Sequence, residues 1–120
     1  MSQVKKTTSE EFARMVVDEA SEKMGADIVL LDLRGVSGFT DFFVIVSGET
    51  EQHLDSLCED VARRLRKSGL RAIGREGTGS GGWILLDFPG VTVHFFTRSV
   101  RERYALERLW GRAAEIVRVQ

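Results

Sequence analysis

The chain has 120 residues, enough for one domain with its own core, and its single cysteine, Cys58, excludes an internal disulfide and suits a reducing, cytoplasmic location. No apolar run approaches the ~20 residues that span a bilayer, and residues 1–11 are too polar for a secretory signal. The net charge of −1 hides an uneven distribution: residues 1–60 hold 5 Lys/Arg and 13 Asp/Glu, whereas residues 61–120 hold 12 Lys/Arg and 5 Asp/Glu. The charges of the two halves either mix in the fold or mark a surface that binds a partner.

A helix and two strands are predicted first. Residues 8–11, Thr-Ser-Glu-Glu, have the spacing of a capping box, and apolar residues follow at helical intervals. We therefore expect a helix over residues 10–24, preceded by a flexible segment over 1–8 and ended by a glycine cap at Gly25. Short β-branched and aromatic runs predict strands over 28–33 and 42–46.

The clearest helix of the chain comes next. Starting at Leu54, six apolar side chains recur at i, i+3, i+4, i+7, i+8 and i+11, and basic residues fill the last turns. The helix is expected to start after residues 48–50 and to end at Gly69. Cys58 falls on the apolar stripe and should be a core residue, whereas His53, near the helix start, should be solvated.

The second half of the chain adds three strands and one helix. In order we expect a weak strand over 70–75, a glycine-rich loop over 77–82, a β-hairpin over 83–96, a helix capped by Ser99 and ended by Gly111, and a tail over 115–119 that could add an edge strand. The order α-β-β-α-β-β-β-α predicts an α+β fold, a single domain over 1–120 with a mixed β-sheet flanked by helices.

The hairpin sorts its side chains into two faces. If Pro89 and Gly90 form a two-residue turn, one face is purely apolar: Ile84, Leu86, Phe88, Val91, Val93 and Phe95. The other face carries Trp83, Leu85, Asp87, Thr92, His94 and Phe96. Such a mixture of rings with an acid and an imidazole is typical either of a face covered by helices of the same chain or of a binding surface.

The last predicted helix also carries more large side chains than one core needs. Leu106, Leu109 and Trp110 form one stripe, beside which lie Tyr104 and Glu107. Tyrosine and tryptophan combine a large area with a polar atom and recur as interface anchors. Residues such as Trp110 and Leu106 are more often buried in a core, so Tyr104 and Trp83 are the better candidates for exposure.

Residues for catalysis are hard to find. The glycine loop over 77–82 lacks the lysine of a phosphate-binding loop and leads into a strand. Asp32 and Asp41 resemble the metal-binding carboxylates of nucleotide-transferring enzymes, but no Asp-x-Asp follows a Gly-Ser element. His94 could pair with Asp87 in a structural role. We predict no catalytic residue, no metal site, no cofactor and, without a Lys/Arg-rich run, little or no direct nucleic-acid readout.

Several short motifs occur along the chain in an order that is typical of a known family. They are Thr-Asp-Phe-Phe-Val-Ile at 40–45, Ser47-Gly48, His53, Glu76-Gly77, Gly-Trp-Ile-Leu-Leu-Asp at 82–87, Val-His-Phe-Phe at 93–96 and Arg-Glu-Arg-Tyr-Ala-Leu-Glu-Arg-Leu-Trp at 101–110. Together they resemble the ribosomal silencing factor S family, also called Iojap-related, across residues 9–112. The turn at 88–90 and the glycine-rich loop depart from the family's pattern.

The resemblance implies a nucleotidyltransferase-like fold without its catalytic residues and a protein that is not an enzyme. It implies binding to the large ribosomal subunit through ribosomal protein fourteen of that subunit, which blocks joining of the small subunit and represses translation under nutrient limitation. Homodimers and a cytoplasmic location are expected as well.

The residues expected to contact the ribosomal protein share the aromatic face and the last helix: Trp83, Asp87, Tyr104, Leu106, Glu107 and Trp110. Trp83 and Tyr104 would be anchors, Leu106 and Trp110 an apolar floor, and the two acids would pair with basic groups. Two alternatives stay open. One is a small nucleotidyltransferase-like enzyme that uses Asp32 or Asp41 with magnesium, and the other is a homodimerisation module that consumes the whole aromatic face.

Overall fold

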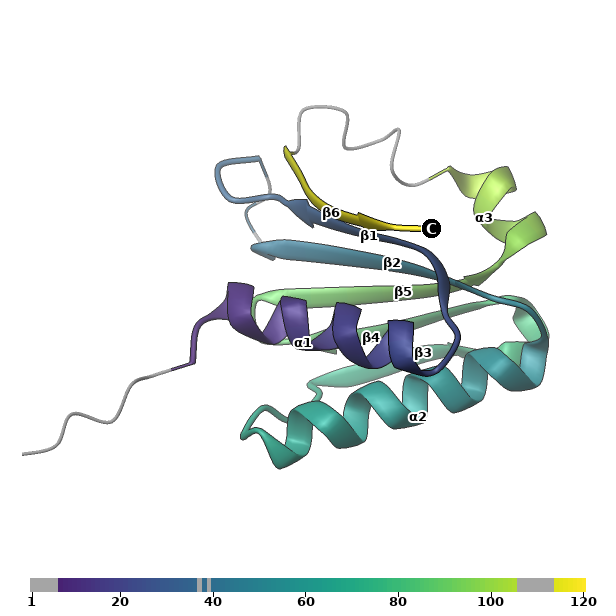
Figure 1. Cartoon of the computed structure of the whole chain (residues 1–120), viewed down its shortest axis with the longest axis horizontal. Helices are drawn as coiled ribbons and strands as arrows, with labels where there is room; N and C mark the ends of the chain where they lie inside the picture. Colours follow the sequence, from purple (N-terminus) through teal and green to yellow (C-terminus); the bar gives the residue numbers. More distant parts are fainter. Residues whose placement is uncertain (1–6, 37, 39, 106–113) are drawn as a thin grey trace, which may run out of the picture.

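The computed structural model describes residues 7–36, 38, 40–105 and 114–120, and Figure 1 shows one β-sheet with helices on it. The elements in chain order are α1 (Ser9–Glu22), β1 (Ala26–Asp32), β2 (Phe42–Gly48), α2 (Glu51–Lys67), β3 (Gly74–Thr78), the 3₁₀ turn η1 (Gly79–Gly81), β4 (Trp83–Phe88), β5 (Val91–Thr97), α3 (Arg98–Tyr104) and β6 (Ala114–Val119).

The sheet has six strands in the order β3-β4-β5-β2-β1-β6. Only β2 and β5 run parallel, and the other neighbours are antiparallel. Helices α1 and α2 pack side by side against the sheet, while α3 follows β5 at one end of it (Figure 1). The predicted α+β class, the mixed sheet and the order of elements are confirmed, and the tail forms the edge strand β6 beside β1.

Hydroxyl side chains begin the two long helices. The Thr8 hydroxyl accepts a hydrogen bond from the Glu11 backbone N–H, and Thr50 receives one from the backbone N–H of His53. Thr8 thus has a defined role as a cap, while residues 1–6 of the segment predicted to be flexible lie outside the described residues.

The end of α1 corrects the prediction of a glycine cap. Met24, not Gly25, takes the positive φ, of 69°. Gly25 is needed for a different reason, because a Cβ there would lie 2.8 Å from Val46 Cγ1 and 2.9 Å from the Ala20 carbonyl oxygen. The glycine lets the chain pass from α1 to β1 against the sheet.

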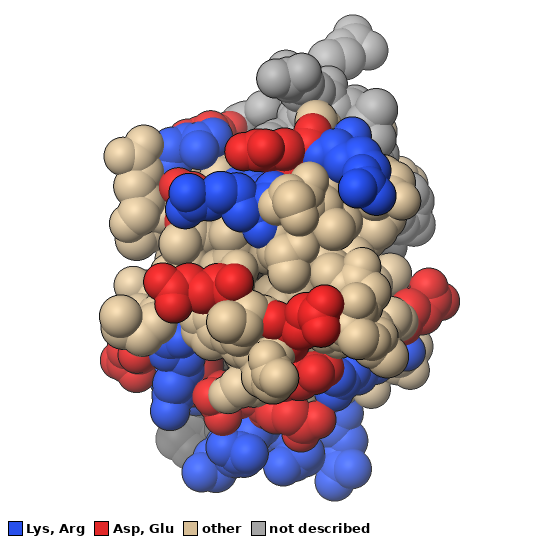
Figure 2. Space-filling model, turned by 90° about the vertical axis from the view of Figure 1, so that its right-hand side faces the viewer, with Lys and Arg blue, Asp and Glu red and all other residues tan. Residues whose placement is uncertain are grey.

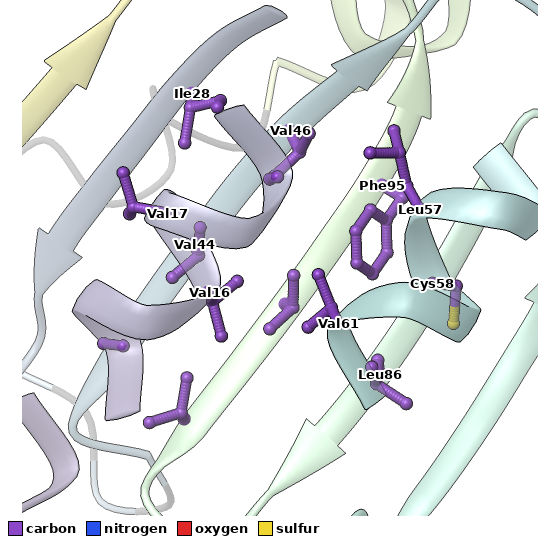
Figure 3. Close-up of a cluster of buried hydrophobic side chains, with 14 of the residues drawn as sticks. Val16, Val17, Ile28, Val44, Val46, Leu57, Cys58, Val61, Leu86 and Phe95 are labelled. Carbon is purple, nitrogen blue, oxygen red and sulfur yellow. The ribbon is translucent and has the colours of Figure 1, made fainter. Parts of the chain in front are cut away.

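The main core lies between the sheet and helices α1 and α2, where side chains of both helices point at the strands (Figure 3). The predicted apolar face of the hairpin belongs to it, with all six side chains at most 2% exposed. The register is also as predicted, with Phe88 opposite Val91 and Ile84 opposite Phe95. Cys58 is fully buried on α2, as expected of a core residue.

The opposite face of the sheet carries a second, smaller apolar cluster, here called the second face. Its buried members are Val29, Leu31, Leu33, Phe43, Ile45 and Phe96, and Trp83 and Val100 pack against it. This face receives the alternate side chains of the hairpin, so the mixed face predicted for β4 and β5 is the one that α1 and α2 do not cover.

The predictions around β3 and α3 need correction. Strand β3 covers Gly74–Thr78 rather than 70–75, so it takes in the start of the predicted loop. Thr97, which ends β5, is the residue preceding α3, so Ser99 lies inside the helix and is not its cap. The helix ends at Tyr104 because Ala105 adopts a left-handed conformation with φ 46°. The rest of the predicted helix, residues 106–113, lies outside the described residues.

Candidate binding surface

Trp83 and Tyr104 meet on the second face. Trp83 begins β4, opposite Phe96 of β5, and the two ring centroids are 5.0 Å apart. Tyr104 ends α3 and tilts against the indole of Trp83 at a centroid distance of 4.8 Å. The tyrosine remains 48% exposed, whereas Trp83 is partly buried. The two predicted anchors therefore form one aromatic pair with an accessible side.

The buried side chain of His94 contacts Trp83 of this pair. Its Nδ1 accepts a hydrogen bond of 3.1 Å from Trp83 Nε1, and its ring meets Phe43 edge-on at 4.8 Å. The imidazole is only 6% exposed, and burial lowers its pKa to about 4, so it is neutral at pH 7. Because Nδ1 accepts, the proton sits on Nε2, which is buried and has no hydrogen-bond partner among the described residues.

The predicted pairing of His94 with Asp87 is therefore wrong. Asp87 stands opposite Thr92, and its Oδ1 accepts a hydrogen bond of 3.2 Å from the Thr92 hydroxyl. Asp87 lies on the same face as Trp83 but four residues along β4, roughly 13 Å away at the rise of a strand. The structure places the acid at the other end of the second face, not beside the aromatic pair.

A groove between β3 and β4 borders Trp83. It has a volume of about 220 Å³ and is lined by Glu76, Gly77, Trp83 and Leu85. Gly77 must be glycine, because its φ is +85° and a Cβ would lie 2.2 Å from the Trp83 carbonyl oxygen. Glu76 and Leu85 were not among the predicted contact residues. They stand opposite each other in the β3–β4 ladder. This pairing could be predicted only if the position of β3 was known.

Arg101 fixes α3, and with it Tyr104, at the end of the sheet. This arginine is only 8% exposed and donates hydrogen bonds to the Asp27 carbonyl oxygen and the Ser47 hydroxyl. Beside it lies a cleft of about 490 Å³ whose lining includes arginines as well as Asp27 and Glu102. Figure 2, which views this end of the molecule, shows basic and acidic side chains interspersed.

Ion pairs join the acidic and basic halves of the chain. Arg64 on α2 lies 3.5 Å from Glu19 on α1, and Arg75 on β3 lies 3.2 Å from Asp55 and 2.9 Å from Glu59 on α2. The charges of the two halves therefore mix in the fold at these places, which is the simpler of the two explanations offered for the uneven distribution.

The two acids considered for a metal site differ in their surroundings. Asp32 is held by Arg34 at 2.7 Å, and the hydrogen bonds from Arg34 lower the pKa of this carboxyl group. Asp41 is exposed. In the described part of the chain, no group of three or more His, Cys, Asp or Glu residues could hold a metal ion.

His53, expected to be solvated, is partly exposed, and both of its ring nitrogens have partners within the chain. Its Nδ1 accepts from the Glu49 N–H at 3.1 Å, and its Nε2 lies 2.8 Å from the Lys23 carbonyl oxygen. The ring thus links the start of α2 to the end of α1.

Three of the six predicted contact residues can be placed. Trp83 and Tyr104 are in contact, and Asp87 shares their face. Leu106, Glu107 and Trp110 lie outside the described residues. None of the helices described here has the length and apolar character to cross a membrane.

Together these features define a small α+β domain that carries a partly exposed aromatic pair on the second face of its sheet. The family model "Ribosomal silencing factor during starvation", RsfS, matches residues 6–120, and the chain belongs to this family.

Individual proteins show the same likeness. Ribosomal silencing factor RsfS of Haemophilus influenzae is 35% identical over 87 residues, which cover 72% of this chain and 85% of that protein. A crystal structure of a protein from Chromobacterium violaceum superposes with a TM-score of 0.84 at 28% identity and covers 88% of each chain. The mouse protein named mitochondrial assembly of ribosomal large subunit protein 1 is 27% identical over 99 residues, covering 80% of this chain and 43% of its own length.

Proposed function

We propose that this protein is a ribosomal silencing factor that binds the large ribosomal subunit through ribosomal protein fourteen of that subunit. Bound there, it would block joining of the small subunit and repress translation under nutrient limitation. The family supports a ribosomal role during starvation, and the name of the mouse relative refers to the large subunit. The role requires a binding surface and bulk but no catalytic group, so we propose a protein that is not an enzyme.

The aromatic pair is the observation that carries the proposal. The tilted rings of Trp83 and Tyr104 lie 4.8 Å apart on the face that α1 and α2 leave uncovered, and Tyr104 is 48% exposed. Large aromatic side chains at the centre of an interface supply much of its binding energy. We propose that Asp87, farther along the same face, pairs with a basic side chain of the ribosomal protein, and we propose the same for Glu107.

Steric exclusion follows from size. A compact domain of 120 residues is about 30 Å across, wide enough to keep two subunit surfaces apart. A factor seated on ribosomal protein fourteen at the intersubunit side would therefore prevent joining without any chemical step. We place this activity in the cytoplasm.

The contact is tested by Trp83→Ala and Tyr104→Ala, with Met24→Ala as the control. Met24 is 78% exposed and precedes β1, in the connection from α1. Each aromatic variant should weaken binding to purified large subunits at least about 30-fold, or ~2 kcal/mol, while Met24→Ala binds normally. Circular dichroism checks that each variant folds. Tyr104→Ala leaves a smaller cavity than Trp83→Ala, because Tyr104 is more exposed than Trp83. Normal binding by both aromatic variants would overturn this site.

The same variants examine the proposed homodimer. Sedimentation of Tyr104→Ala without ribosomes shows whether its ring lies in a dimer interface, because loss of the dimer would then accompany the substitution. An unchanged oligomeric state together with weakened subunit binding assigns Tyr104 to the ribosome contact instead.

A further inference from the structure

The indole of Trp83 has a single polar atom, and that atom points into the protein. Nε1–H is donated to Nδ1 of His94 at 3.1 Å. Trp83 stands opposite Phe96 on β5, so His94 is its diagonal neighbour two residues back along that strand. The bond therefore ties the first residue of β4 to the middle of β5.

His94 is itself held firmly. Its strand lies between β4 and β2, so the backbone is paired on both sides. The imidazole is 6% exposed, meets Phe43 edge-on at 4.8 Å, and lies parallel to the ring of Phe96 with centroids 6.0 Å apart. An acceptor in this position cannot follow the indole if the indole turns, so the hydrogen bond selects one orientation of Trp83.

Packing alone gives no reason for a histidine here. Nε2–H is buried without a partner in the described part of the chain, which is unfavourable for stability. An apolar side chain of similar shape would fill the space without this cost. The hydrogen bond that the imidazole makes among the described residues, acceptance of the Trp83 N–H at Nδ1, is one that an apolar group could not make.

We propose that His94 is a positioning residue for partner binding. By accepting the indole N–H, His94 holds the Trp83 ring against Phe96 and Tyr104. In this orientation Trp83 also lines the groove beside Glu76 and Leu85. The partner then meets a fixed ring whose polar atom is already satisfied, so little conformational freedom is lost on binding. This inference rests on the proposed function and adds His94 to the residues that govern it.

Three variants separate positioning from packing. His94→Leu removes the acceptor, and His94→Phe does so while keeping an aromatic ring. His94→Asn keeps an acceptor on the same branch as Nδ1. Ile45→Val is the matched control, because Ile45 is buried on the same face directly opposite His94 but offers Trp83 no acceptor.

Two readouts are needed. The indole ¹⁵N–¹H signal of Trp83, identified by its absence from Trp83→Phe, reports the hydrogen bond in the free protein. His94→Leu and His94→Phe should shift this signal and speed its exchange with water, whereas His94→Asn should not. Affinity for purified large subunits should fall about three- to tenfold in the first two variants, the range of one net hydrogen bond. His94→Asn should restore it to within about threefold, and Ile45→Val should bind normally.

The outcomes distinguish the two proposals. If His94→Leu and His94→Phe shift the indole signal but bind as tightly as Ile45→Val, the positioning role is overturned and the proposed function stands. If the unmodified protein does not bind large subunits, the proposed function falls, and the binding role of His94 falls with it. Loss of binding in all four variants, including Ile45→Val, would show that packing of the second face is what matters and would also overturn the positioning role.

Discussion

Acidification should destabilise this domain through His94. Burial of the imidazole lowers its pKa in the folded protein from 6.5 to about 4, whereas in the unfolded chain it titrates near 6.5. Between these two values the unfolded chain binds a proton that the folded protein does not. The contribution of His94 to the free energy of unfolding is therefore fully present above pH 6.5, and it decreases as the pH falls toward 4.

The size of the effect follows from the two pKa values. One pKa unit corresponds to about 1.4 kcal/mol, so the contribution lost relative to pH 7 is about 2 kcal/mol at pH 5 and about 3 kcal/mol at pH 4. That is a large part of the 5–15 kcal/mol that stabilises a typical domain. Below pH 4 the folded protein is protonated as well, and the loss from this residue levels off.

Urea unfolding at pH 7, 6, 5 and 4 measures the effect, with His94→Asn as the reference. Asparagine does not titrate, and the carboxyl groups of Asp32 and Glu115, whose pKa values are lowered by arginine partners, are present in both proteins. Their contributions cancel in the difference between the two proteins. A difference that stays constant within about 0.5 kcal/mol from pH 7 to pH 4 would refute the conclusion that His94 is buried and neutral.

Three further predictions concern single positions. Gly77→Ala should cost about 1–3 kcal/mol in urea unfolding, because its Cβ would meet the Trp83 carbonyl oxygen, whereas Gly74→Ala, with open space around it, should be tolerated; equal costs would contradict this. Arg101→Met should cost about 2–3 kcal/mol, because it abolishes the hydrogen bonds that fix α3, and near-wild-type stability would count against that anchor. The buried Cys58 thiol, with its pKa raised to about 11, should react with an aromatic disulfide reagent only after unfolding in urea, and rapid reaction of the native protein would show that it is accessible.

The hairpin could be predicted from the sequence because its pattern is local. Pro89-Gly90 sets the turn, and strict alternation then assigns every side chain of β4 and β5 to a face. Strand β3 has no such pattern, since all five of its residues are exposed, and its position depends on pairing with β4. The groove beside Trp83 was missed for the same reason.

The roles of the two histidines depended on distant contacts. His53 reaches the Lys23 carbonyl oxygen 30 residues away, which no spacing within α2 could indicate. His94 pairs diagonally with Trp83 rather than with Asp87, because the register places Thr92 opposite the acid. The stop of α3 at Ala105 also lacks a sequence signal, because alanine rarely takes a positive φ.

The most direct test of the proposed function is co-sedimentation of the purified protein with separated large and small ribosomal subunits. The proposal predicts that the protein pellets with large subunits only. It also predicts that prior addition of the protein lowers the yield of joined particles on sucrose gradients when small subunits follow. Absence of binding to either subunit, or binding that leaves subunit joining unchanged, would contradict the proposal that this protein silences ribosomes by occupying the large subunit.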